Sequence, residues 1–180
     1  MNRFKSAVSV MLMCLLATAC ASQQLTQDIE VTTKQRPGVD LSRYRTYTWL
    51  ETSQIVNDPL GQWEPPDFDS DAEVKRLVGR ELAKHGMTSA VDKPDMVVTF
   101  VAGIEMLSLE LREDPKKDGK KTLQNIPKGA LVVVLADATS RIRLWVGVAA
   151  GDVGKQHDSS AVQRRLDYAI TEMFRRYPAK

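Results

Sequence analysis

The chain has 180 residues, with 25 lysines and arginines against 23 aspartates and glutamates, two histidines and two cysteines. Residues 1–19 have the pattern of a removable leader, and without its Arg3 and Lys5 the basic and acidic side chains balance at 23 each. A neutral domain has no electrostatic basis for binding nucleic acid, whose phosphates favour a basic face. A chain of this length is expected to form one domain.

The first nineteen residues are typical of a secretory signal peptide. A basic start precedes an apolar stretch at 7–16, and the small residues Ala17-Thr18-Ala19 close it. That stretch is about ten residues long, whereas a bilayer-spanning helix needs about twenty, and no later stretch approaches this length. We therefore expect export, and a mature protein that does not thread the membrane.

Cys20 occupies the position at which lipoprotein processing requires a cysteine, so we predict cleavage between Ala19 and Cys20 and lipid on the Cys20 thiol. The usual leucine three places earlier is Ala17 here, and ordinary signal peptidase would cut the same bond. A soluble periplasmic protein is thus the alternative, although a free thiol at the start of an exported chain would be unusual. The other cysteine, Cys14, is removed with the leader, which leaves no internal disulfide.

The lipid predicts a firm membrane anchor. Each buried methylene of an acyl chain contributes about 0.8 kcal/mol, so a diacylglycerol with or without an added palmitate holds the protein stably. Ala21 and Ser22 follow the cysteine, and neither is the aspartate that retains many lipoproteins at the inner membrane. We therefore expect an outer-membrane lipoprotein of the bacterial cell envelope that faces the periplasm.

Several segments are predicted to be strands because apolar and β-branched residues alternate or dominate in them. Residues 28–33 and 44–50 alternate, and the run at 95–104 is apolar on both sides, which favours a central strand. Residues 130–136 and 142–148 form two more strands, and the four residues 137–140 near their junction favour a hairpin.

Two amphipathic helices complete the expected fold. The proline-rich segment 51–69 is predicted to be a loop, and a helix follows it with Ser70 as cap, Glu73 reaching back to the cap, and Gly86 at its end. A second helix is expected from about Ser159. These elements predict an α+β fold: a mainly antiparallel sheet of about five or six strands with two helices packed on one face.

The expected organisation is therefore a signal peptide at 1–19, a lipidated tether at 20–27 and a single α+β domain at 28–180. Whether the two helices cover the whole sheet does not follow from the pattern. A sheet face left bare would itself be a docking site.

With these elements placed, the chain resembles the lipoprotein family catalogued as domain of unknown function 4136. The resemblance rests on the stretch Tyr44-Arg45-Thr46-Tyr47-Thr48-Trp49 within 40–50, and on segments 82–87, 95–98, 129–137, 144–147 and 174–178. Val146 stands where members of the family usually carry a basic residue, and the loop at 112–128 is individual. The resemblance implies an envelope lipoprotein and no assigned reaction.

No catalytic constellation is present in the sequence, so we expect a protein that is not an enzyme and binds no cofactor. The histidines, His85 and His157, lie at predicted helix ends, without the pairing that metal sites require. Ser159 and Ser160 beside His157 and Asp158 resemble a hydrolase cluster, but Asp158 or Ser159 is expected to be a helix cap. An envelope hydrolase remains a distant alternative.

A lysine-rich loop is the one predicted feature whose chemistry suggests a particular ligand. Leu107, Leu109 and Leu111 alternate before it. The candidate anion-binding residues are Lys116, Lys117, Lys120, Lys121 and Lys128. They suit lipid phosphate or an anionic polymer, although lysine-rich hairpin tips are usually only solvated.

Four aromatic side chains are a second candidate for a ligand-binding site, as the lining of a groove. Tyr44, Tyr47, Trp49 and Trp145 lie on predicted strands, where such residues most often fill the layer between sheet and helices. The leading hypothesis is a non-catalytic, periplasm-facing interaction or structural module held by its N-terminal lipid, with an envelope protein as partner. The alternative is a binding module for an anionic envelope component through the lysine loop.

Overall fold

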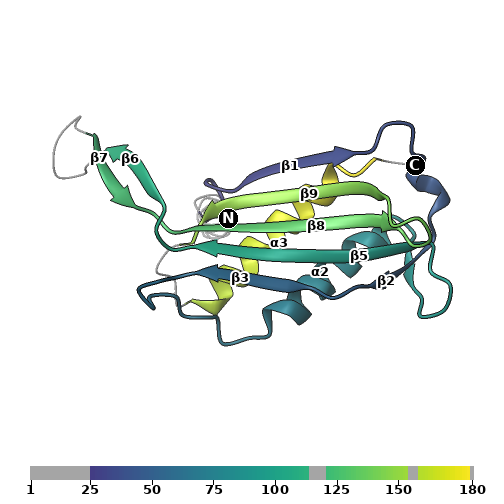
Figure 1. Ribbon diagram of the computed structural model, residues 1–180, viewed down its shortest axis with the longest axis horizontal. Coiled ribbons are helices and arrows are strands. Elements are labelled where there is room, and N and C mark those ends of the chain that lie inside the picture. Colours follow the sequence, from purple (N-terminus) through teal and green to yellow (C-terminus); the bar gives the residue numbers. More distant parts are fainter. Residues whose placement is uncertain (1–24, 114–120, 154–157, 179–180) are drawn as a thin grey trace, which may run out of the picture.

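The computed structural model describes residues 25–113, 121–153 and 158–178. The predicted signal peptide, Cys20, and Lys116, Lys117 and Lys120 of the lysine loop lie outside these residues. Over the described residues the chain forms two layers, a sheet with two helices behind it (Figure 1). No helix among them has the length and apolar content needed to cross a bilayer.

The elements follow one another along the chain with bounds close to those expected. The strands are β1 (Glu30–Gln35), β2 (Thr46–Trp49), β3 (Ser53–Asn57), β4 (Thr88–Ser89), β5 (Met96–Glu105), β6 (Leu109–Glu113), β7 (Lys121–Asn125), β8 (Lys128–Asp137) and β9 (Arg143–Asp152). The helices are α2 (Ser70–Lys84) and α3 (Ser159–Arg175), with a short 3₁₀ turn at Leu41–Arg43.

The main sheet is mixed, which corrects the expectation of a mainly antiparallel sheet with five or six strands. It has seven strands in the order β1-β9-β8-β5-β2-β4, and β3 pairs with the second half of β5. The pairs β1·β9, β9·β8 and β8·β5 are antiparallel, whereas β5·β2, β5·β3 and β2·β4 are parallel. Because α2 returns the chain to the end of the sheet where β2 began, β5 runs parallel to β2 and β3.

The two strands of the main sheet that were not predicted are short and lie in segments without a clear pattern. Outside the main sheet, β7 was not predicted either, because it lies in the segment expected to be the lysine-rich loop. β3 lies within the proline-rich segment 51–69 that was predicted to be a loop, and its five residues are all exposed. β4 has only two residues. Both are held by backbone pairing to a neighbour, a contact that local periodicity does not reveal.

Both helices begin and end on side-chain and backbone caps. In α2 the cap is Asp69 and not Ser70, because the Asp69 carboxylate accepts the N–H of Ala72 while Glu73 pairs with Arg76. Gly86, at φ 77°, follows the helix as predicted, and the N–H of Met87 returns to the carbonyl of Leu82. Asp158 caps α3 by accepting the N–H of Ser160.

The core lies between the helices and one face of the sheet, as expected. The largest fully buried side chains are Trp145, Phe100, Phe174, Leu77, Leu82, Met96, Leu135, Ile170 and Met173. Strand register brings the sheet members together, since Phe100 lies opposite Val133, and Leu135 opposite Trp145.

An ion-pair cluster joins the two helices at the edge of this core. Arg80 on α2 donates to Asp167 and Thr171 on α3 and to its neighbour Glu81, and Lys84 also donates to Glu81. Burial raises the pKa of Glu81, but the hydrogen bonds from Lys84 and Arg80 outweigh burial and leave that pKa below its ordinary value. The cluster therefore holds a buried carboxylate in its charged form.

Candidate functional site

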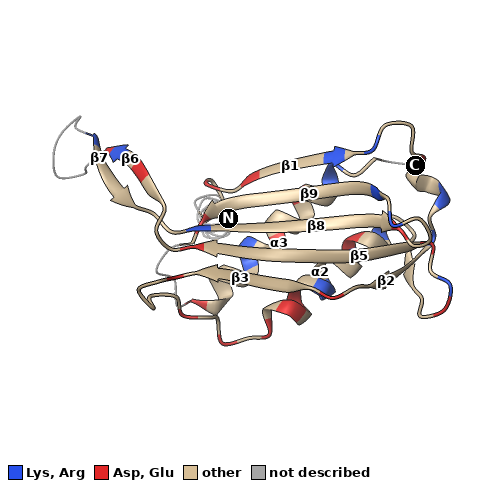
Figure 2. Ribbon diagram, in the orientation of Figure 1, with Lys and Arg blue, Asp and Glu red and all other residues tan. Residues whose placement is uncertain are grey.

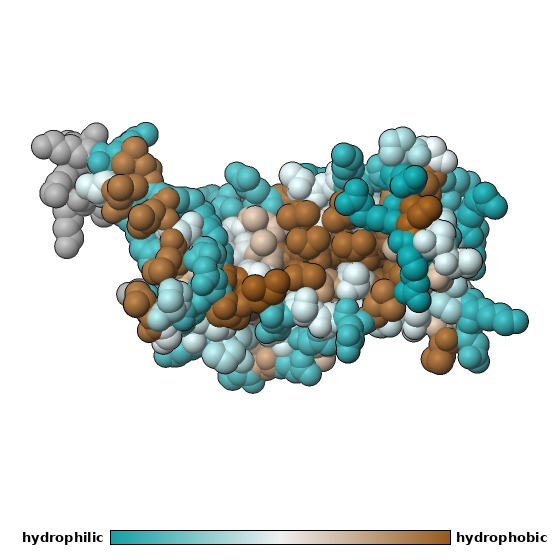
Figure 3. Space-filling model, viewed as in Figure 1, coloured by the Kyte–Doolittle hydropathy of each residue, from teal (hydrophilic) through white to brown (hydrophobic). Residues whose placement is uncertain are grey.

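The sheet face opposite the helices is uncovered within the described residues, and it is apolar. Figure 2 shows charges mainly at the strand ends and on the helices, with the middle of the central strands free of them. Figure 3 shows a continuous apolar strip across this face, over β5, β8 and β9. We call this surface the open face.

Strand alternation produces the open face. On β8 and β9, residues facing the helices alternate with residues facing outward, so that Val132 lies opposite Val148 and Val134 opposite Val146. Val101 of β5 lies opposite Val132. These five valines are half-buried, and no helix among the described residues covers them.

In sheets whose strands are all parallel, both faces are covered and the strands are apolar on both sides. β5 has parallel neighbours in β2 and β3 and is apolar on both of its faces, with Val97 buried and Val101 half-buried on the open side. The sequence of β5 thus suits two covered faces, while the described chain covers one. Contiguous apolar surface of this kind marks interaction sites on soluble proteins.

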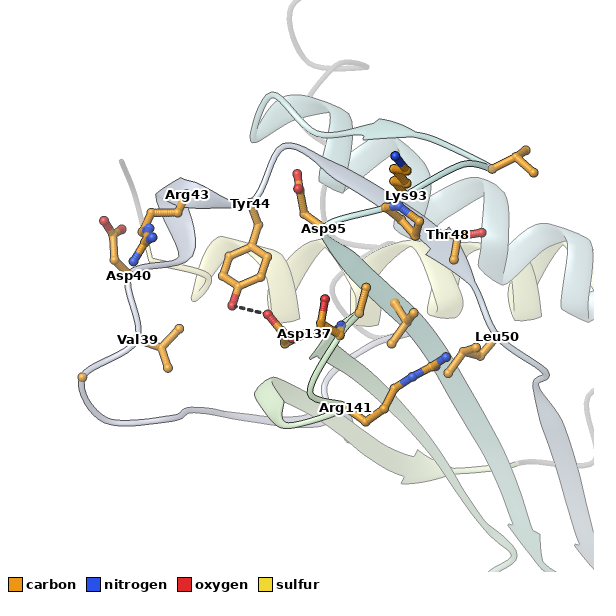
Figure 4. Close-up of a pocket in the computed structure, with 16 residues that line it drawn as sticks. Val39, Asp40, Arg43, Tyr44, Thr48, Leu50, Lys93, Asp95, Asp137 and Arg141 are labelled. Atoms are coloured by element: carbon orange, nitrogen blue, oxygen red, sulfur yellow. Dashed lines mark hydrogen bonds between the residues drawn. The ribbon is translucent and has the colours of Figure 1, made fainter.

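A groove of about 1010 Å³ adjoins the open face at the end where β5 begins (Figure 4). Thr48, Leu50 and Val97 contribute the open-face side of its lining. Three connecting segments supply the rest: the loop around Asp40, the loop at 91–95 before β5, and the turn between β8 and β9.

The acidic side chains of the groove accept hydrogen bonds from the surrounding loops, and these bonds hold the loops in place. Asp95 accepts the N–H groups of Arg45 and Thr46, which lowers the pKa of Asp95. Asp137 accepts the N–H and hydroxyl of Ser140 and the hydroxyl of Tyr44, and these bonds lower the pKa of Asp137. Both carboxylates stay charged and serve to fix the groove walls.

The basic side chains of the groove are less engaged. Arg43, Lys93 and Arg141 line it, and none forms an ion pair with another described residue. Lys93 and Arg141 have φ of 47° and 58°, in the left-handed region that non-glycine residues seldom adopt. Figure 4 shows the Arg141 side chain extended toward Leu50, so a cation lies beside the apolar strip.

The predicted anion-binding lysines do not form one described site. Lys128 bonds to Asp152 and Glu110 at 2.6 Å each, so its charge is already neutralised. Lys121 is exposed at the start of β7. The structure therefore does not bring Lys121 and Lys128 together as ligands for an anion.

The residues considered for metal binding and hydrolysis have structural roles wherever the structure describes them. His85 ends α2 and packs its ring 4.7 Å from that of Tyr177, and His157 lies outside the described residues. Ser159 bonds to Asp67, and Asp158 is the cap of α3. No group of three or more metal-binding side chains occurs among the described residues.

The four aromatic residues divide between core and groove. Tyr47 and Trp145 are buried in the core, and Trp49 packs edge-on against Tyr47 and Phe100. Tyr44 lines the groove. Burial raises the pKa of Tyr44, as does its bond to Asp137, so it is a neutral donor.

The sequence did not indicate the contacts of Arg165 and Arg176. Arg165 bonds to both oxygens of Asp28 and to the carbonyl of Leu25, and Arg176 bonds to the carbonyl of Val31. Glu172 pairs with the neighbouring Arg175 and leaves Arg176 to this contact. α3 thereby holds the start of the described chain against the sheet.

The fold and the open face together define the class: a two-layer α+β domain in which the described helices cover one face of the sheet. A family model places the chain more closely. It matches residues 31–179, and the chain belongs to the family described as Domain of unknown function (DUF4136). No curated protein matches the chain.

Solved structures share the fold at low identity. A DUF4136 family protein from Bacteroides thetaiotaomicron is 12% identical with a TM-score of 0.51, over 84% of this chain and 96% of that one. A PDZ domain protein from Parabacteroides distasonis is also 12% identical with a TM-score of 0.51, over 92% of this chain and 40% of that one. This chain thus spans well under half of the Parabacteroides protein, and both likenesses concern the fold alone.

Proposed function

We propose that this protein is a non-catalytic interaction module of the bacterial envelope, anchored in the outer membrane by lipid on Cys20 and facing the periplasm. Its open face binds an envelope protein. The observation that carries the proposal is the uncovered apolar strip formed by Val101, Val132, Val134, Val146 and Val148.

The chemistry of the open face favours a protein partner. Polysaccharide binding needs converging hydrogen-bond donors and acceptors, whereas the centre of this strip presents methyl groups. The core of a protein interface is apolar with a polar rim, and charges there set orientation. Arg141 and Lys93 at the groove end favour a partner whose apolar surface is flanked by carboxylates.

A photo-crosslinking amino acid at Val134, installed in cells, tests this proposal. We expect an adduct with one envelope protein, identified by mass spectrometry, and loss of that adduct when Val132→Lys and Val148→Lys are added. Arg141→Glu should weaken it. The matched control is the same amino acid at Gln163, exposed on α3, where no such adduct is expected.

Equal adducts from both positions, or an adduct that survives the lysines, would contradict binding through the open face. Turnover of an envelope polymer that is abolished by a point change within the domain would overturn the non-catalytic assignment. For the lysine-loop alternative, Lys128 is already occupied by two carboxylates, which leaves Lys121 as its one exposed lysine among the described residues.

A further inference from the structure

β6 and β7 form a separate two-stranded arm that projects from one end of the main sheet (Figure 1). Its register puts Leu111 opposite Leu123, and alternation brings Leu109 to the same face. Leu109 is 67% exposed, Leu111 is 61% exposed and Leu123 is 69% exposed. We call this surface the leucine face.

The other face of the arm is polar and is joined to the main sheet. Arg112 bonds to Glu110 and to Asp152 of β9, and Lys128 of β8 bonds to the same two carboxylates. Four charges thus hold the polar face toward the domain. The leucine face consequently points away from it.

Nothing among the described residues covers the leucine face. An isolated two-stranded hairpin is marginally stable in water. Apolar side chains gathered in this way mark a surface that contacts something else.

The arm lies at the end of the molecule where the described chain begins. The N–H of Asp152 donates to Asp28, while the Asp152 carboxylate accepts from Arg112, so one residue touches both the chain start and the arm. Arg165 fixes Asp28 and the carbonyl of Leu25 at the same place. The chain therefore leaves the domain beside the base of the arm.

Cys20 precedes Leu25 by five residues, which reach about 17 Å when fully extended. Five residues of β6 span about the same length. A bilayer that holds lipid on Cys20 thus comes within reach of the arm. Leu60, in the turn after β3 at this end of the sheet, is also exposed.

We propose that the leucine face inserts into the interfacial region of the leaflet that holds the Cys20 lipid, as a second membrane contact that orients the domain. The inference rests on the lipid anchor of the proposed function. Glu113 and Lys121 lie opposite one another at the outer end of the leucine face. There the Lys121 ammonium group meets lipid phosphates and the Glu113 carboxylate stays in the aqueous headgroup layer, while the leucines contact acyl chains.

The test uses the lipidated mature protein in vesicles of phosphatidylethanolamine and phosphatidylglycerol that contain doxyl-labelled lipid. A fluorophore is attached to Leu111→Cys or, as matched control, to Thr122→Cys on the polar face of the same arm. We expect the doxyl groups to quench position 111 at least threefold more than position 122. Adding Leu109→Asn and Leu123→Asn should reduce quenching at 111 to the control level, with an unchanged urea midpoint.

Equal quenching at both positions on vesicles that retain the protein would overturn the second contact and leave the anchor intact. A disulfide between two Leu111→Cys copies, without quenching, would assign the face to a second copy and overturn it as well. Protein that is not retained by vesicles, with a Cys20 thiol that takes up the fluorophore, would overturn the anchor itself and the contact that rests on it.

Discussion

Gly147 and Gly103 lie on opposite faces of the sheet, and the space around each glycine shows whether its face is covered. A Cβ at Gly147 would lie 2.5 Å from a Trp145 ring carbon and 3.0 Å from the Met173 sulfur, whereas a Cβ at Gly103 has no atom within 4 Å. The difference between the packed and the open face is thus visible at single residues.

Gly147→Ala should lower the free energy of unfolding by about 1–3 kcal/mol, because the added methyl group overpacks the core. Gly103→Ala should leave it unchanged or raise it by about 0.4–1 kcal/mol, since the strand conformation suits alanine. Urea unfolding of both variants is the measurement. Equal losses would mean that the open face is covered within the chain.

A second residue-scale contrast comes from adjacent arginines on α3. Arg165 is 18% exposed and bonds to Asp28, whereas Arg164 is 57% exposed and lies 3.8 Å from Asp158. Burial raises the pKa of Asp28, but the bonds from Arg165 and from the Asp152 N–H outweigh burial and lower it.

Arg165→Met should therefore destabilise the protein by about 1–3 kcal/mol and speed hydrogen exchange at the Asp152 amide, whose acceptor is Asp28. Arg164→Met should change stability by less than about 0.5 kcal/mol. Denaturation and amide exchange measure the two effects. If both variants behave alike, Arg165 does not hold the chain start.

At the scale of elements, the two helices are joined by a charged cluster around the buried Glu81. The pKa of Glu81 is lower in the folded protein than in the unfolded chain, so folding favours its charged form. Its contribution to stability is complete above the unfolded pKa of about 4.3 and is lost as the pH falls through the lower folded pKa.

Glu81→Gln should accordingly cost about 1–3 kcal/mol at pH 7, and the difference from the native protein should shrink as the pH falls below about 4. Urea midpoints measured from pH 7 to pH 3 test this. Exposed Glu51→Gln is the control and should show no such convergence. If the stability difference between Glu81→Gln and the native protein does not change with pH, Glu81 does not contribute to the loss of stability in acid.

At the scale of the whole molecule, the leucine face is separate from the open face and from the groove that adjoins the open face. The leucine face and the chain start share one end of the sheet, while the groove lies at the other end. In the proposed arrangement the arm and the lipid meet the membrane, and the open face remains available to a partner.

The anchor is tested by the intact mass of mature protein recovered from membranes. We expect a chain that begins at Cys20 with at least a diacylglycerol-sized increment, and loss of that increment in Cys20→Ser. An unmodified mass that begins at Cys20 would instead mean a soluble periplasmic protein, and the search for partners would move to diffusible ligands.

The sequence by itself determined the two helices, the end of α2, the start of α3, the central place of β5 and the β8–β9 pair. Those features depend on local signals: 3.6-residue and two-residue periodicity, a left-handed glycine at Gly86 and a capping aspartate at Asp158. The same signals misplaced the cap of α2 by one residue, since Asp69 and Ser70 offer equivalent oxygens.

Only the tertiary structure decided strand direction, the bare face of the sheet and the orientation of the arm. Alternation shows that Val132 and Val134 share a face, but coverage of that face depends on where α2 and α3 cross the sheet. Parallel pairing of β5 follows from the path of α2, and the leucine face points outward because Arg112 and Lys128 hold the other face. Each of these depends on contacts between residues far apart in the chain, which no local pattern encodes.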